Sequence, residues 1–134
     1  PLCVRHRLRG PVESAGPGGG VRFAPCAGND GTIDALGFRI GGLAYLPDGK
    51  EMNDAAWAAV ADLDCWIVDA LRYTPHPTHS HFEQTLEWIA RASPKRAVLT
   101  NMHIDLDYQA VCDSTPDHVT AAYDGLQITY DDVA

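Results

Sequence analysis

Short apolar runs alternate with helical patterns along most of this chain, and that alternation limits the fold more than any other feature of the sequence. Strands are predicted in the segments 21–28, 36–46, 65–71 and 96–100, and helices in the segments 53–63 and 78–92. Helices inserted between consecutive strands are typical of crossover connections, which join parallel strands. The order therefore predicts an α/β layer structure with parallel pairing in its middle.

Glycine and proline mark the expected turns. The segment 10–20 is rich in both residues and predicts a turn or mobile loop before the first strand. Gly41 and Gly42 interrupt the strand 36–46, where we expect a bulge or a close backbone approach. Asp124-Gly125 favours a β-hairpin over 119–130.

The segment 78–92 carries the strongest helical pattern of the chain. Thr78 stands where a cap residue would stand, and Phe82, Leu86 and Ile89 recur at helical spacing. We expect these three apolar side chains to pack against the sheet. The shorter helix 53–63 has Asn53 as its expected cap.

Composition narrows the class of protein. The 134 residues carry a net charge of −8 and start at Pro1, so we expect a single partial domain with a loop-rich start at 1–20 and strand and helix alternation over 21–134. An acidic chain does not favour nucleic acid, which requires clustered Lys and Arg. Four scattered cysteines without a CxxC pair fit a reducing cytoplasm, and no apolar run is long enough to span a membrane.

Acids and histidines follow the predicted strands. Asp48 comes after the run 36–46, Asp69 ends the next one, and His79 and His81 precede the second helix. His103 follows the last apolar run. In parallel sheets ligands bind outside the carboxyl ends of the strands, and carboxylates with imidazoles are ordinary ligands of zinc or manganese.

Each of these residues also has a structural interpretation. Asp48 in "PDG" is a common turn residue, and Asp69 can be a structural residue at a strand end. His79 and His81 can be surface residues at the start of a helix, and His103 can be a hydrogen-bonded loop residue. Only the shared edge of the sheet favours a common site.

The order of these motifs resembles a known family. The strings "LGFRIGGLAYLPD", "LDCWIVDALRYTPHPTHSHFEQTLEWI", "PKRAVLTNMHIDLDY" and "AYDGLQI" are similar to the C-terminal half of metallo-β-lactamase-fold hydrolases, near the phosphoribosyl cyclic phosphodiesterases. The resemblance implies an αββα sandwich of which this chain is the C-terminal half. It also implies two divalent metal ions, zinc or manganese, bridged by an aspartate and by the hydroxide that attacks the substrate.

The resemblance assigns roles to particular residues. Asp48 matches the bridging aspartate, which is both a metal ligand and part of the catalytic group, and His79 matches the histidine that assists the leaving group. His103 lies in the segment that supplies the last metal ligand. His81 and Arg72 are the residues that we expect to contact substrate.

The sequence departs from the family pattern in three places. The first metal motif, HxHxDH, does not occur in the chain. Asp30 stands where the family usually has a metal-binding histidine, so we take it as a candidate ligand. Asn101 follows "LT" where many relatives have the last histidine, and His103 comes two residues later.

These features predict a metal-dependent hydrolase, with a small-molecule phosphodiester as the expected substrate and neither nucleic acid nor membrane as a partner. A homodimer is compatible with the sequence. We expect the isolated chain to be inactive, because it lacks the HxHxDH half. The alternative is a non-catalytic truncated domain of the same fold that binds a ligand or partner.

Overall fold

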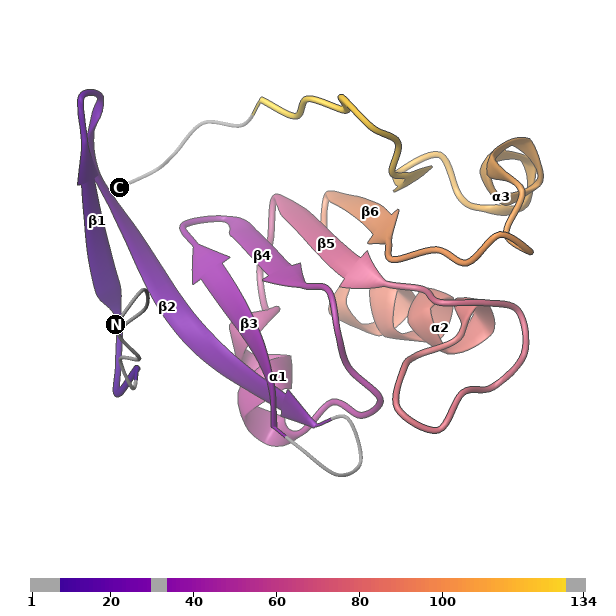
Figure 1. Ribbon diagram of the computed structural model, residues 1–134, viewed down its shortest axis with the longest axis horizontal. Coiled ribbons are helices and arrows are strands. Elements are labelled where there is room, and N and C mark those ends of the chain that lie inside the picture. Colours follow the sequence, from indigo (N-terminus) through magenta and orange to yellow (C-terminus); the bar gives the residue numbers. More distant parts are fainter. Residues whose placement is uncertain (1–7, 30–33, 130–134) are drawn as a thin grey trace, which may run out of the picture.

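A single mixed sheet forms the centre of the structure (Figure 1). The computed structural model describes residues 8–29 and 34–129. The strands lie side by side in chain order: β1 Val12–Gly16, β2 Gly19–Asn29, β3 Asp34–Ile40, β4 Leu43–Leu46, β5 Cys65–Asp69, β6 Arg96–Thr100 and β7 Val119–Ala121. Pairing is antiparallel from β1 to β4 and parallel from β4 to β7. The prediction of an α/β structure with parallel pairing is confirmed.

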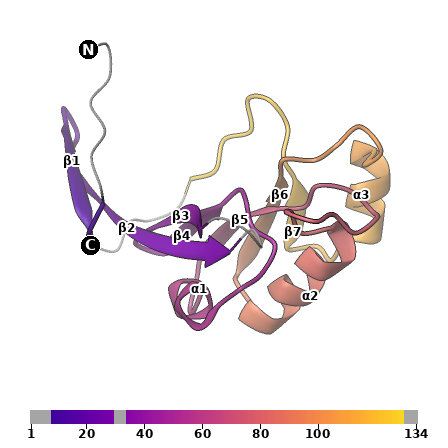
Figure 2. The same cartoon turned by 60° about the horizontal axis from the view of Figure 1, so that its bottom comes forward.

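Helices make the crossovers between the parallel strands. Helix α1 (Asp54–Ala59) joins β4 to β5, α2 (Phe82–Ala92) joins β5 to β6, and α3 (Tyr108–Ser114) joins β6 to β7. Figure 2 shows α1 and α2 on the same side of the sheet. None of the described helices has the length and apolar character needed to cross a membrane.

The main core lies between the sheet and the helices α1 and α2. Trp66 of β5 is fully buried, and the register places it between Ala44 of β4 and Ala97 of β6. Val60, beside α1, and Ile89 of α2 belong to the same buried cluster. Small residues beside Trp66 make room for its ring, so the three strands share one closely packed layer.

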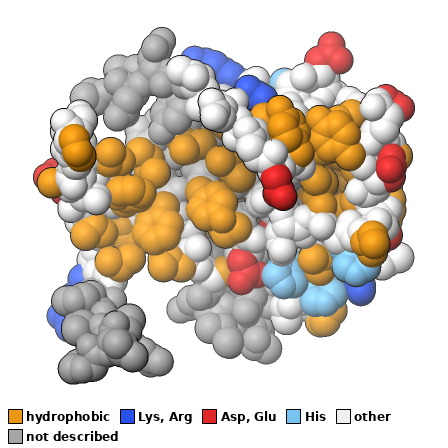
Figure 3. Space-filling model, turned by 45° about the horizontal axis from the view of Figure 1, so that its top comes forward, with side chains coloured by type: hydrophobic (Ala, Val, Ile, Leu, Met, Phe, Trp, Pro, Cys, Tyr) orange, Lys and Arg blue, Asp and Glu red, His pale blue; other side chains and the backbone are white. Residues whose placement is uncertain are grey.

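The opposite face of the sheet carries exposed apolar side chains (Figure 3). Val21, Leu36 and Tyr45 are at least 38% exposed. On the same face the rings of Phe23 and Phe38 meet edge to face with centroids 6.1 Å apart. One helical layer on one sheet is half of an αββα sandwich, as predicted for a C-terminal half.

Two predictions about the antiparallel part are wrong in detail. The segment 10–20 is a β-hairpin, in which β1 pairs with β2 around a turn that Gly19 permits with its φ of +115°. The run 36–46 is also a hairpin rather than one bulged strand. Gly41 has a φ of +55°, which glycine adopts at little cost, and a Cβ on Gly42 would lie 2.1 Å from the carboxylate of Asp64, so a side chain there would require Asp64 to move.

The predicted hairpin over 119–130 is wrong as well. Strand β7 is short and pairs in parallel with β6, and the chain up to residue 129 forms no second strand after it. The Asp124-Gly125 turn is present, with a φ of +87° at Gly125. The Ala122 N–H donates to the carbonyl of Leu99 in β6. This N–H is therefore not available to a second strand of a hairpin.

Helix α2 begins later than its sequence pattern indicates. The helix starts at Phe82 with His81 as the N-cap, whereas Thr78 faces the ring of His76. The backbone of Ser80 bonds with Gly49 and Leu71, so the segment before His81 is irregular and not helical. Phe82 and Ile89 are buried as expected, and Leu86 packs at the edge of the core.

Candidate active site

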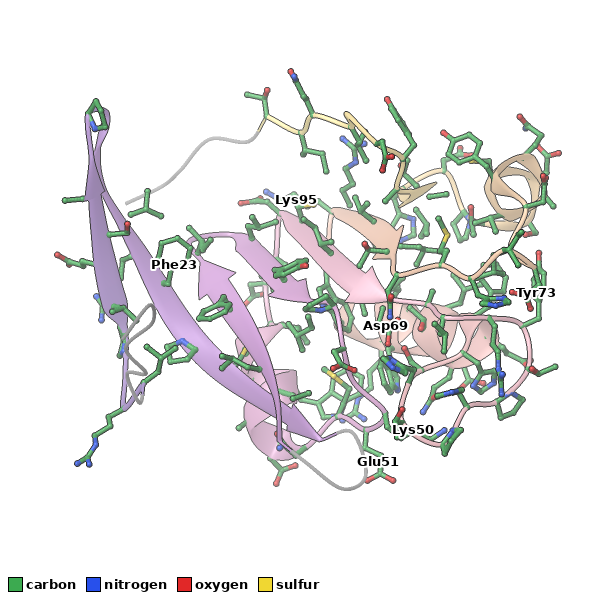
Figure 4. All side chains as sticks on the ribbon, viewed as in Figure 1. Phe23, Lys50, Glu51, Asp69, Tyr73 and Lys95 are labelled. Atoms are coloured by element: carbon green, nitrogen blue, oxygen red, sulfur yellow. The ribbon has the colours of Figure 1, made fainter. Side chains whose placement is uncertain are left out.

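The carboxyl ends of β4, β5 and β6 bring polar side chains to one edge of the sheet. Asp48 follows β4, Asp69 is the last residue of β5, and Asn101 follows β6. Figure 4 labels Asp69 at the tip of its strand. His79 reaches this edge from the irregular segment between β5 and α2. Three strands and one loop therefore position the group.

His79 lies between two carboxylates. Its Nδ1 is 2.8 Å from Oδ2 of Asp69 and 3.2 Å from Oδ1 of Asp48. One ligand atom from each of these three residues lies within 4.8 Å of the others. Ionised carboxylates only accept hydrogen bonds, so Nδ1 carries a proton and Nε2 is the nitrogen left for another partner.

Asp69 is the buried member of this group. Its side chain is 1% exposed, and Asn101 Nδ2 donates to its Oδ1 over 3.1 Å while His79 occupies Oδ2. Burial raises the pKa of Asp69, against the opposing effect of the hydrogen bonds from His79 and Asn101. Both carboxylate oxygens therefore have donors, although the group is removed from water.

Hydrogen bonds from the next segment hold the backbone around Asp69. Its carbonyl accepts from Ser80 Oγ over 2.8 Å and from Thr85 Oγ1 over 2.7 Å. The Ser80 N–H donates to the Gly49 carbonyl over 2.7 Å, which ties the loop of His79 to the loop of Asp48. The two loops are therefore connected directly.

His103 lies outside the group of three. Its side chain is 58% exposed, and Nδ1 is 3.1 Å from Oδ1 of Asp105. Its backbone N–H donates to the Leu71 carbonyl over 2.7 Å, so the loop after β6 is attached to the loop after β5. The convergence of His103 with Asp48 and His79 remains a prediction.

The other candidates have varied surroundings. His81 is the N-cap of α2 without a side-chain capping bond, and its buried Nδ1 has no hydrogen-bond partner among the described residues. Arg72 donates to the carbonyls of Thr74 and Pro75 and so braces its own loop. Asp30 lies outside the described residues.

Another histidine, His76, stands beside the site. The rings of His76 and His79 have centroids 5.2 Å apart, and Figure 3 shows histidine side chains gathered beside an acidic one. The pKa of His76 is lowered, first by desolvation and then by the positive charge of Arg72. A neutral ring fits its contact with Thr78, whose backbone N–H donates to His76 Nδ1 over 3.3 Å.

An open groove continues the same edge past β6. It has a volume of about 410 Å³ and is lined by Thr100, Asn101, Met102, Ala122, Tyr123 and Asp124. Asn101 therefore borders the groove while its amide bonds Asp69. The groove offers space for a small molecule next to the polar group.

Sequence reasoning underrated two residues of this network. The sequence pattern favours a structural role for Asp69 and marks Asn101 only as a departure from a metal ligand. The available signal was that Asp69 and Thr100 each close the apolar part of a predicted strand; in the structure these two residues pair, so β5 and β6 end together. Two polar residues that leave adjacent parallel strands at one level are neighbours.

Only some of the side chains at this edge suit a divalent cation as ligands. Asp48 has a half-exposed carboxylate, of which Oδ1 approaches His79, and oxygen with imidazole ligands suits zinc or manganese. Asp69 fits poorly, because both of its oxygens already accept N–H donors. Within residues 8–29 and 34–129, Asp48 is thus the best-placed metal ligand.

The fold and this edge define the class of protein. Residues 3–104 match the family model described as the beta-lactamase superfamily domain, which covers most of the chain. The chain belongs to that family and has the metallo-β-lactamase fold.

Solved structures give the same result. The crystal structure titled "a New Diphosphatase from the PhnP Family" is 29% identical with a TM-score of 0.87, over 94% of this chain and 49% of that one. The metallo-β-lactamase fold protein YhfI from Bacillus subtilis is 14% identical with a TM-score of 0.68, over 89% of this chain and 52% of that one. Zn(2+)-bound PqqB from Methylobacterium extorquens is 16% identical with a TM-score of 0.61, over 82% and 50%. The last two show the fold alone.

Among curated proteins, an octanoyltransferase from Porphyromonas gingivalis (strain ATCC BAA-308 / W83) is 29% identical over 105 residues. Those residues make up 76% of this chain but 21% of that protein. The chain therefore spans about a fifth of the curated relative and about half of each of these solved structures.

Proposed function

We propose that this chain is the C-terminal half of a metal-dependent hydrolase that cleaves a phosphodiester or diphosphate bond. The observation that carries the proposal is the bond from His79 Nδ1 to the buried Asp69, beside the exposed Asp48. A histidine held through Nδ1 by a buried carboxylate has its other nitrogen available for proton transfer. The 29% identity to a solved diphosphatase supports a substrate that contains phosphate groups.

The proposed division of labour follows from the surroundings of each residue. A divalent metal held by Asp48 and His103 would supply positive charge for the phosphate oxygens. In its doubly protonated form His79 gives the Nε2 proton to the leaving oxygen and keeps the Nδ1 proton, which Asp69 holds; Asp69 thereby keeps the ring oriented and balances the imidazolium charge. The groove beside Asn101 receives the part of the substrate that extends past β6.

The chain alone is expected to be inactive. The string HxHxDH, which the family uses for its first metal ligands, does not occur in these 134 residues. One exposed aspartate and one exposed histidine are too few ligands to hold two metal ions. Activity tests therefore use the natural protein that carries this chain.

The decisive experiment compares two charge-matched variants of the natural protein. Asp48→Asn should lower bound zinc or manganese and decrease hydrolysis of a cyclic phosphodiester or a diphosphate by at least about 10²-fold. Asp113→Asn is the control, since Asp113 is an exposed residue of α3 that accepts a bond from Gln109. It should change neither quantity.

His79 is tested separately. His79→Gln should lower kcat by about 10² to 10⁴, as the loss of a general acid does, with metal content unchanged. If the metal-loaded parent hydrolyses none of these substrates, the proposal fails and a non-catalytic binding domain becomes the better interpretation. Equal kcat for His79→Gln and the parent removes the acid role.

A further inference from the structure

Asn101 has a left-handed backbone conformation. Its φ is +56°, in the left-handed region, which costs most residues energy but which asparagine tolerates better. Thr100 ends β6 in register with Asp69, and the left-handed turn at the next residue accompanies a side chain directed back toward β5. The left-handed backbone and the side-chain hydrogen bond therefore both direct Asn101 toward Asp69.

The Asn101 amide has a definite partner. Nδ2 donates to Oδ1 of Asp69 over 3.1 Å, while His79 Nδ1 donates to Oδ2 over 2.8 Å. With one oxygen occupied by each donor, the buried carboxylate is held at both corners. Rotation of the Asp69 side chain would break both bonds and leave a carboxylate that is 1% exposed without its donors.

We infer that Asn101 is a positioning residue, which acts through Asp69 to keep His79 in the Nδ1–H tautomer. This inference rests on the proposed function, because the tautomer matters only if Nε2 meets a substrate. Asn101 occupies the position where the sequence comparison expected a metal ligand in many relatives. Its amide is engaged with Asp69 instead, so Asn101 serves the histidine and not the metal.

The test measures the tautomer directly. Nitrogen-15 spectra of the histidines in the zinc-loaded natural protein distinguish Nδ1–H from Nε2–H, and a His79→Gln variant assigns the signals. In the parent His79 should be mainly Nδ1–H. Asn101→Gly, which tolerates a positive φ and removes the amide, should shift His79 toward a mixture of tautomers and lower kcat by about 10-fold with KM little changed.

Two further variants separate the amide from the backbone. Asn101→Asp keeps the shape but replaces the donor by an acceptor that repels Asp69, so it should disturb the tautomer at least as much as glycine. Ser93→Gly is the matched control, because Ser93 has a φ of +52° at the C-cap of α2. It should leave the tautomer and kcat unchanged.

The outcomes distinguish this inference from the proposed function. An unchanged His79 tautomer in Asn101→Gly or Asn101→Asp overturns the inference, whatever the activity of the parent. Loss of zinc from Asn101→Gly also overturns it, since Asn101 would then be a ligand. A parent that hydrolyses nothing defeats the proposed function, while a tautomer shift in Asn101→Gly would still establish the hydrogen-bond chain.

Discussion

Gly37 in the centre of β3 has no room for a side chain. The variant Gly37→Ala therefore tests how tightly β3 packs against β4, the strand that precedes Asp48. An added Cβ would lie 2.8 Å from Leu46 Cγ and 2.9 Å from the Tyr45 carbonyl oxygen. Carbon atoms in contact stay at least about 3.5 Å apart, so Leu46 or the strand must move by about 0.7 Å. Both neighbours belong to β4, the strand that leads to Asp48.

The expected cost follows from two opposing effects. Overpacking a core typically costs about 1 to 3 kcal/mol of stability. Replacing glycine by alanine opposes this cost, because it lowers the conformational entropy of the unfolded chain and so stabilises the protein by about 0.4 to 1 kcal/mol. We expect Gly37→Ala to lower the free energy of unfolding by about 1 to 2 kcal/mol and Tm by about 3 to 8 °C. Urea denaturation of the natural protein, followed by tryptophan fluorescence, measures the first quantity.

Gly20→Ala is the matched control, because Gly20 also lies in a strand but a Cβ there meets nothing within 4 Å. It should be neutral or slightly stabilising. Since Leu46 precedes Asp48 by two residues, Gly37→Ala should also lower hydrolysis, whereas Gly20→Ala should not. Equal stability of the two variants would refute the packing argument.

Three further predictions concern the buried carboxylate and two helices. Burial raises the pKa of Asp69 above 3.8, so folding binds this proton more tightly and stability falls as the pH rises from that value through the folded pKa. Asp69→Asn removes this loss, so its stability relative to the parent should rise as the pH increases above 3.8 in urea titrations, and a fall would contradict the sign. Ile89→Ala leaves a cavity under the sheet and should cost about 2 to 5 kcal/mol in the same measurement, unlike the exposed Ala90→Ser. Asn53→Ala removes the cap bond of 2.8 Å to Ala56 N and should cost about 1 kcal/mol, so an unchanged stability would show that the cap is dispensable.

Apolar periodicity accounts for the parts of the fold that could be predicted. The run 96–100 coincides with β6, and the run 65–71 contains β5, because buried parallel strands need side chains that are apolar on both faces. The same periodicity did not predict where α2 starts. Its apolar positions show which face is buried, but the start at Phe82 depends on backbone bonds of Ser80 to Gly49 and Leu71, which are distant in sequence.

The candidate site was predictable only as an edge of the sheet. Strand ends correctly indicated Asp48 and the neighbourhood of His79, since parallel strands bring their carboxyl ends together. The partner of His79 was not predictable, because Asp69 lies ten residues earlier and the connecting loop has no regular spacing. A buried acid at a strand end has the same sequence pattern whether it orients a histidine or caps a loop.

The cost of burying Asp69 explains why its surroundings are so fully bonded. Its carboxylate takes N–H donors from His79 and Asn101, and its carbonyl takes hydroxyl donors from Ser80 and Thr85. An incomplete set would leave a charged or polar group unpaired away from water, which costs more than an apolar residue in its place. The bonds that satisfy Asp69 also hold the irregular loop of His79 against the end of β5. The position of His79 is therefore set by a central strand of the sheet, and a substitution that frays the C-terminal turns of α2 should weaken folding before it moves this histidine.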